Sequence, residues 1–300
     1  MTDPTTRPLD STALAGAFLC CALWGGNSVA VKYAVPDLPA FGCAAIRFLL
    51  SLPVIALACW KVGQPLTVPR PLWGLLIVNA LLAVVQIGSF NWGTSHSLAG
   101  RSSVFINVYP LVVAPLAWLI LGEWMGKKGI LGILSAASGV VLLLSASFWI
   151  SPGSRDDGSL VGDLVVLGSG VLFGVQTIVQ KKTFPLIPPA TLLFSQSVLA
   201  IPVFLAYSGL FEGYDTYQGT PQAIWGVLYQ GLLVSGGCFT GWMLLLRRYP
   251  AGRLATLAFV TPLFGVLLGN LTRGEPLTWQ LLGGGALVGV GIYLVATDRK

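Results

Sequence analysis

"AGRSSVFINVYPLVVAPLAWLILGE", residues 99–123, returns in altered form as "AGRLATLAFVTPLFGVLLGNLTRGE", residues 251–275. The two segments lie 152 positions apart, and the same shift pairs Trp73 with Trp225. Further matches are Gly74 with Gly226, Gly132 with Gly284 and Gly139 with Gly291 at this shift, and Gly25 with Gly174, Pro36 with Pro185 and Pro53 with Pro202 at a shift of 149. Such shared positions in fixed register are hard to obtain by chance. We therefore interpret the chain as a duplication of two units, residues 12–149 and 161–297.

Composition predicts that both units lie in a membrane. The chain is 55% hydrophobic and 9% charged, whereas about a quarter of the residues of a soluble domain are charged. Apolar runs of roughly 20 residues have the length of a helix that crosses a bilayer core. They predict ten spans, near residues 12–34, 38–60, 71–95, 98–122, 128–149, 161–183, 188–209, 222–246, 252–273 and 277–297.

The number of spans in each unit sets the relation between the units. Five is an odd number, so the second unit must cross the membrane in the opposite sense to the first. The predicted fold is therefore an all-α membrane protein, with ten transmembrane helices forming two inverted five-helix repeats around a central cavity. Inverted repeats recur in secondary transporters, whose binding site near the midplane opens to alternate sides.

The distribution of charge predicts the orientation. With the N-terminus inside, twelve of the 17 Lys and Arg residues lie on the cytoplasmic side, four lie outside and Arg47 lies within a span. The positive-inside rule then places both termini in the cytoplasm of a multi-pass inner-membrane protein. All five cysteines fall inside spans without zinc or disulfide spacing. We expect no metal, no cofactor and no nucleic-acid partner.

Short motifs resemble a known family. ALWGGNSVAVKYA (22–34), AAIRFLL (44–50) and the P…GE pattern that ends the fourth and ninth helices resemble the EamA-type members of the drug/metabolite transporter superfamily. The resemblance covers residues 12–297 and implies that both units are EamA-type repeats forming one transport unit. It implies a basket of ten helices with a cavity lined by helices 1, 3 and 4 and helices 6, 8 and 9, and export of amino acids or other small metabolites. The second unit departs from the pattern, with Phe173 for Trp24 and Gln196 for Arg47.

Helical spacing predicts cavity residues independently of the family resemblance. Trp24 and Asn27 share one face of the first helix, and their counterparts Phe173 and Gln176 share one face of the sixth. Amides are costly against lipid, so they either line a cavity or join neighbouring helices; we predict the cavity. Further polar or aromatic candidates on helices 3, 4, 8 and 9 are Gln86, Asn91, Trp92, Asn107, Tyr109, Tyr229, Thr240 and Thr261. A neutral, aromatic lining suits a zwitterion or a modest organic solute better than a bare ion.

Three residues interrupt the apolar spans. Arg47 lies near mid-membrane, where a charged side chain costs roughly 2.5–3.5 kcal/mol on insertion scales. It either receives a substrate carboxylate or ties the second helix to its neighbours. Pro110 and Pro262 fall at the centres of the fourth and ninth spans, where proline kinks a helix; they are either hinges or static bends. No Asp or Glu falls in the middle of a span, so we expect facilitated transport or exchange rather than tightly proton-coupled export.

These features favour one function over the others. A membrane enzyme would need acids, bases, nucleophiles or metal ligands clustered at one depth, and a channel would need charged rings or carbonyl filters. We expect no enzyme but a secondary transporter that exports small metabolites, preferably amino acids, by alternating access. Multidrug or organic-cation efflux and a nucleotide-sugar-type carrier remain alternatives. The expected partners are a small-molecule substrate and the lipid bilayer, with the chain a monomer or weak homodimer.

Overall fold

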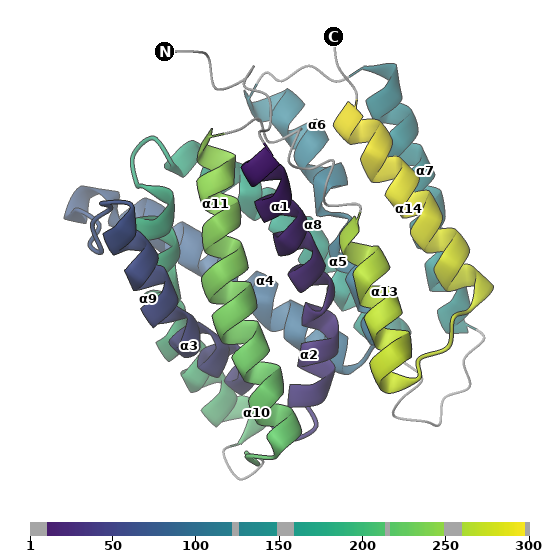
Figure 1. Ribbon diagram of the computed structural model, residues 1–300, viewed down its shortest axis with the longest axis horizontal. Coiled ribbons are helices and arrows are strands. Elements are labelled where there is room, and N and C mark those ends of the chain that lie inside the picture. Colours follow the sequence, from purple (N-terminus) through teal and green to yellow (C-terminus); the bar gives the residue numbers. More distant parts are fainter. Residues whose placement is uncertain (1–10, 122–125, 149–158, 214–216, 249–259, 298–300) are drawn as a thin grey trace.

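The computed structural model of the protein describes residues 11–121, 126–148, 159–213, 217–248 and 260–297. Its helices (Figure 1) are α1 (Ser11–Gly25), α2 (Asn27–Ala34), α3 (Ala40–Lys61), α4 (Trp73–Ser95), α5 (Ala99–Ile106), α6 (Tyr109–Leu121), α7 (Lys127–Phe148), α8 (Leu160–Thr183), α9 (Pro189–Tyr207), α10 (Pro221–Leu228), α11 (Phe239–Arg248), α13 (Val260–Arg273) and α14 (Trp279–Thr297). A 3-10 turn (Arg70–Leu72) precedes α4, and π-helical segments follow α9 (Ser208–Glu212) and α10 (Tyr229–Cys238, η3).

The helices follow the predicted spans closely. Eight stretches of the described chain are long and apolar enough to cross a membrane, and they match the first eight predicted spans. The last two predicted spans correspond to α13 and α14. The start of the span 252–273 lies outside the described residues.

The fourth span is interrupted at its centre, directly before Pro110. Helix α5 ends at Ile106 and α6 begins at Tyr109, so Pro110 is the second residue of α6 and the break precedes it. Proline lacks an N–H, and its ring clashes with the carbonyl four residues earlier, here that of Ile106. The first turn of a helix tolerates both properties. Pro262 likewise lies in the first turn of α13, and the residues before Val260 lie outside the described part.

The helices gather into four contacting groups. Helix α8 packs along α4, α5 and α6, while α1 packs against α11, η3 and α13. Helices α7 and α14 run side by side at one edge, and α3 and α9 pack together at the opposite edge (Figure 1). We call the end where α1 begins and α14 finishes the terminal end, and the opposite end, where α2 finishes and α10 begins, the distal end.

Exposed tryptophans mark both ends of the bundle. Trp60 and Trp73 lie at the terminal end, and Trp225 and Trp279 lie at the distal end; each exposes more than half of its side-chain surface. Tryptophan concentrates where the bilayer meets water. The four residues are therefore placed as two interfacial belts on either side of an apolar band.

Close glycine contacts between α7 and α14 occur as a matched pair. A Cβ atom on Gly291 would lie 2.5 Å from the carbonyl oxygen of Gly132, and a Cβ on Gly139 would lie 2.6 Å from that of Gly284. The 152-residue shift relates Gly132 to Gly284 and Gly139 to Gly291. The two contacts are therefore equivalent: each joins the same two positions of the repeat, with the two halves exchanged. Both contacts depend on the absence of a side chain.

Two hydrogen bonds show the same reciprocal arrangement between the halves. The Ser169 hydroxyl donates to the carbonyl oxygen of Gln86 (2.8 Å), and at the corresponding positions the Cys20 thiol donates to the carbonyl oxygen of Cys238 (3.8 Å).

Two helix N-termini are also capped by side chains from the other half, one in each direction. The Gln64 side chain accepts from the backbone amide of Ala190 at the start of α9 (2.9 Å). The Glu212 carboxylate accepts from the amide of Phe41 at the start of α3 (3.1 Å). These contacts from one half to the other therefore have counterparts in the reverse direction.

The distal end is closed by α5 against α13. Backbone amides of Ala99 and Gly100 donate to the Glu275 carboxylate (2.8 and 2.9 Å), which satisfies the free N–H groups that begin α5. Below this cap, a Cβ on Gly265 would lie 2.2 Å from the Cβ of Ser103. The backbone of α13 therefore lies directly against the Ser103 side chain of α5.

An ion pair is buried near the same end. Arg101 on α5 pairs with Asp163 on α8, and both side chains are almost fully buried. The Ser97 hydroxyl also donates to Asp163 (2.5 Å). The charge count placed Arg101 outside the membrane, but the structure shows it in the protein interior with its counter-charge.

Candidate functional site

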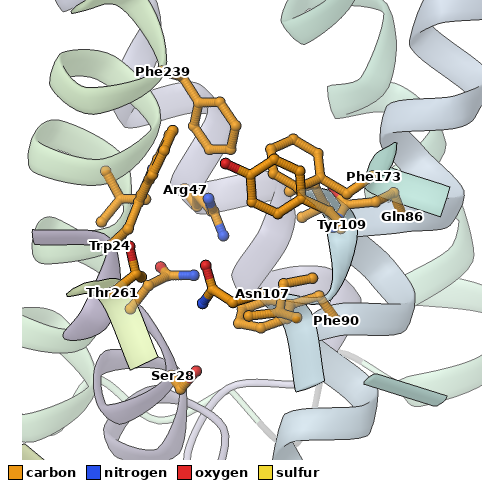
Figure 2. Close-up of a pocket in the computed structure, with 14 residues that line it drawn as sticks. Trp24, Ser28, Arg47, Gln86, Phe90, Asn107, Tyr109, Phe173, Phe239 and Thr261 are labelled. Carbon is orange, nitrogen blue, oxygen red and sulfur yellow. The ribbon is translucent and has the colours of Figure 1, made fainter. Parts of the chain in front are cut away.

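A cavity lies at the centre of the bundle, where helices from both halves meet (Figure 2). Its volume is about 50 Å³, below the roughly 300–1,000 Å³ of small-molecule pockets. The cavity is therefore contracted in this conformation. The lining residues are Trp24, Asn27, Ser28, Arg47, Gln86, Ile87, Phe90, Ile106, Asn107, Tyr109, Phe173, Val234, Phe239 and Thr261.

Two helix breaks place amides at this cavity. Asn27 begins α2 directly after the break at Gly26, and Asn107 lies in the break between α5 and α6. Gly25 lets the chain before Asn27 approach α13 closely, because a Cβ at position 25 would lie 2.7 Å from the carbonyl oxygen of Thr261. Transporters commonly build their sites from such discontinuous helices.

An aromatic wall joins the two halves. The ring of Phe239 on α11 lies 5.4 Å from that of Trp24 and 6.1 Å from that of Phe173, in edge-to-face contacts. Tyr109 lies 4.6 Å from Phe173 on the opposite side. Figure 2 shows Trp24 and Tyr109 facing one another across the cavity, with Phe239 beside them.

Phe239 is not among the cavity residues predicted from the sequence, and the reason is the π-helical segment before it. The amide of Phe239 bonds the carbonyl of Val234, five residues earlier rather than four. This wider turn moves the cavity-facing positions of the eighth span to Val234 and Phe239, one residue away from Thr240. An α-helical periodicity of 3.6 residues could not have found them.

Several polar atoms of the cavity have no hydrogen-bond partner among the described residues. Burying such an atom costs about 1–3 kcal/mol, so each is available to water or a ligand. They are Trp24 Nε1, Asn27 Oδ1, Arg47 NH1, Tyr109 OH and Thr261 Oγ1. By contrast, Gln86 Nε2 donates to Ser169 Oγ (3.0 Å) and Asn107 Nδ2 to the carbonyl oxygen of Ser103 (2.7 Å).

Arg47 enters the cavity from α3. Its side chain is 1% exposed, and Nε donates to Ser235 Oγ at 2.5 Å. The guanidinium carbon lies 5.9 Å from the centre of the Phe239 ring. In Figure 2 the nitrogens of Arg47 lie between Trp24 and Tyr109. None of the described residues that line the cavity is acidic.

The sequence model of the EamA-like transporter family matches residues 11–145 and again residues 160–297. The chain belongs to this family. EamA-like proteins are transporters rather than enzymes, and this transporter is a multi-pass membrane protein.

Relatives with printed descriptions align over nearly the whole EamA-like chain. The uncharacterized transporter YvbV of Bacillus subtilis is 28% identical over 298 residues, covering 98% of this chain and 94% of its own. A probable amino-acid metabolite efflux pump of Salmonella typhimurium is 26% identical over 287 residues, covering 93% and 92%. A protein of known crystal structure has a TM-score of 0.71 at 20% identity, covering 96% of this chain and 97% of its own. At that identity the structure shows a shared fold.

Most predicted residues of the EamA-like transporter meet at the central cavity. Trp24, Asn27, Arg47, Gln86, Asn107, Tyr109, Phe173 and Thr261 all line it. Gln176 lines a smaller adjoining cavity of about 20 Å³, which shares Gln86 and Phe239 with the central one.

Four predicted residues lie elsewhere in the transporter. Asn91 donates to the carbonyl oxygen of Ala40 (3.1 Å) and so joins α4 to the start of α3. Trp92 stacks on His96, with ring centres 4.2 Å apart. Tyr229 lines a separate apolar groove between α2, α10 and α13, and Thr240 is buried outside the cavity lining.

Proposed function

We propose that the protein is a secondary transporter that exports small metabolites, amino acids first among them, by alternating access of two inverted five-helix repeats. The observation that carries the proposal is a central cavity built from both units, whose buried polar atoms lack partners. Trp24, Asn27, Arg47 and Tyr109 come from the unit 12–149, and Phe173 and Thr261 come from the unit 161–297. Substrate would supply the missing hydrogen bonds.

The exchanged contacts support the inverted repeats. A pseudo-twofold axis requires that a contact between two units recur with the partners exchanged. Gly291 on Gly132 and Gly139 on Gly284 fulfil this requirement, as do the side chains that cap α3 and α9. A five-helix unit related by such an axis crosses the membrane in the opposite sense to its partner. The full transport unit would then be ten helices of a single chain, so that a monomer contains the complete site.

The closed distal end supports alternating access. The Glu275 cap and the contact of Ser103 with Gly265 join α5 to α13 on one side of the cavity. The contracted cavity must widen before it holds a metabolite, and separating α5 from α13 would widen it from the distal side. The interruptions beside Gly26 and Asn107 supply positions at which the half-helices turn, and we propose Pro110 and Pro262 as the hinges.

Orientation follows from charge. The predicted orientation puts twelve of the 17 basic residues of the sequence on the side of the terminal end, which the positive-inside rule assigns to the cytoplasm. The distal end would then face away from the cytoplasm across a bacterial-type inner membrane. Export of a cytoplasmic metabolite begins with the cavity open to the terminal end and finishes when the distal contact opens.

The experiment is counterflow in proteoliposomes without an ion gradient. Vesicles are preloaded separately with aromatic, branched and hydroxyl amino acids, and uptake of the labelled compound is compared with empty vesicles. We expect uptake selective for one group, and its loss in Trp24→Ala. Trp60→Ala, which removes an exposed tryptophan, should keep wild-type uptake. Absence of uptake for every preload, from folded protein, would contradict amino-acid transport.

A further inference from the structure

Among the described residues, no acidic side chain faces the guanidinium of Arg47 at the cavity. Its hydrogen-bond partner Ser235 is neutral, and the ring of Phe239 lies beside it. None of the described residues that line the central cavity or the adjoining one is acidic. A buried charge normally requires a partner of opposite sign, because removal from water is costly.

Another buried arginine of the chain, Arg101, has a structural role and does have a partner of opposite charge. Arg101 is buried to a similar degree, and it pairs with Asp163 while Ser97 completes the carboxylate's hydrogen bonds. Arg47 differs in facing a cavity instead of a carboxylate. Arg47 NH1 has no hydrogen-bond partner among the described residues.

The orientation of the guanidinium is built into the contact between α3 and η3. Gly231 and Gly236 bring η3 against α3, where their Cβ atoms would lie 2.6 Å from Leu50 Cβ and 2.8 Å from Val54 Cβ. Ser235 is thereby pressed against Arg47 and holds Nε. With Nε fixed, the terminal nitrogens of the guanidinium are left for a ligand, in the geometry that suits a carboxylate.

We propose that Arg47 binds the carboxylate of the transported molecule, which provides the counter-charge that the protein lacks. This inference rests on the proposed function, because it assigns the substrate class of the same cavity. The repeat counterpart of Arg47 is Gln196, which is neutral, so the site provides for one anionic group. The rings of Trp24, Phe173 and Phe239 face the remainder of the molecule.

The proposal separates the alternatives for the substrate. Amino acids and other monocarboxylates with an apolar body fit the site, and the free Oδ1 of Asn27 can accept a hydrogen bond from an ammonium group. Organic cations do not fit, because two like charges repel strongly in a site shielded from water. The transporter is thereby assigned to organic acids rather than to cationic drugs.

The test compares ligands that differ in one charged group. L-phenylalanine, L-phenylalaninamide, phenethylamine and 3-phenylpropanoate form one set, and L-leucine with L-leucinamide forms a second. Dissociation constants are measured on the full-length protein in lipid nanodiscs, and the same compounds compete in counterflow. We expect the acid of a set to bind roughly 10- to 100-fold more tightly than its amide, the range for hydrogen bonds to charged groups.

Variants locate the preference at Arg47. In Arg47→Gln the ratio of acid to amide affinity should fall toward one, and in Arg47→Lys it should be intermediate, because lysine offers a point charge without the two-pronged contact. Arg247→Gln, which removes an exposed arginine at the terminal end, should keep the wild-type ratio. The ratio compares two ligands on the same protein, so a change in the amount of folded protein does not affect it.

Some outcomes overturn the proposal. If the wild type binds amides or amines as tightly as acids, binds none of the acids, or keeps its preference in Arg47→Gln, Arg47 does not select carboxylates. Should Arg47→Gln fail to fold, the wild-type ratio and the Arg47→Lys variant decide. Transport of amines without transport of acids would leave the carrier function standing, whereas no counterflow for any compound would contradict the function itself.

Discussion

Glu275 caps the first turn of α5, where its Oε2 accepts a hydrogen bond from the backbone amide of Gly100 at 2.9 Å. Gly100 lies in α5 of the first half, and Glu275 lies in the connection from α13 to α14 of the second half, so the bond joins the halves at the distal end. A carboxylate at a helix N-terminus also interacts favourably with the helix dipole. The cap therefore stabilises the conformation in which the distal side is closed.

Glu275→Ala should make the distal side open more often. Loss of a helix cap costs about 1 kcal/mol, which is about a fivefold change in an equilibrium. The measurement is labelling of an Ile106→Cys reporter in the cavity lining by a membrane-impermeant maleimide added to intact cells. Glu212→Ala, which removes the cap of α3 instead, should leave labelling unchanged. Equal labelling with and without Glu275 would show that this cap does not hold the distal side closed.

Gly291→Ala should destabilise the protein, while Gly289→Ala on the same helix should not. The new Cβ at position 291 would lie 2.5 Å from the backbone oxygen of Gly132, whereas nothing lies within 4 Å of a Cβ at position 289. Overpacking of this kind costs about 1–3 kcal/mol. Thermal unfolding of both variants in the same detergent checks the difference. Similar midpoints for the two variants would mean that α7 and α14 pack less closely than described.

Asp163→Asn should destabilise the protein more than any change of an exposed charge. The substitution removes the carboxylate that faces Arg101, and breaking a buried ion pair on one side costs about 3–5 kcal/mol. The double variant Asp163→Asn/Arg101→Gln should recover part of the loss, because it removes the buried charge as well. Thermal unfolding of the single and double variants provides the test. A double variant that unfolds below Asp163→Asn would assign the stabilisation to contacts other than the ion pair.

Phe239→Ala should weaken transport, and Thr240→Ala should not. Phe239 joins Trp24 to Phe173 in the cavity wall, while Thr240 lies outside the lining. Loss of contact with a buried Phe side chain amounts to about 1.5–3 kcal/mol, so the apparent KM in counterflow should rise about tenfold or more. If Thr240→Ala impaired transport and Phe239→Ala did not, the eighth span would face the cavity with α-helical periodicity.

Residue types and spacing predicted much of the cavity because each half brings its own polar and aromatic side chains into an apolar span. Trp24, Asn27 and Phe173 stand out against such a background, and Arg47 stands out by its charge. In a membrane these residues have few places to lie other than the interior. Their meeting point therefore follows from composition and the length of the spans.

The rest depended on backbone geometry that the sequence pattern does not carry. The π-helical segment shifts the eighth span by one residue at Phe239, and the interruption of the fourth span falls at Asn107, three residues before Pro110. The pairing of Arg101 with Asp163 links two spans that are distant in sequence. A charge count assigns both to the exterior, because it considers each residue without its partner.

The difference between Arg47 and Gln196 has a consequence for how a molecule can be held. Two identical arginines at corresponding positions would offer a ligand two equivalent poses, head to one half or head to the other. In this chain the two poses are not equivalent, because position 47 carries a cation and position 196 carries an amide. In the proposed transport cycle a bound molecule would thus have one heading relative to the polypeptide, and it would keep this heading while the opening changes from one face of the membrane to the other.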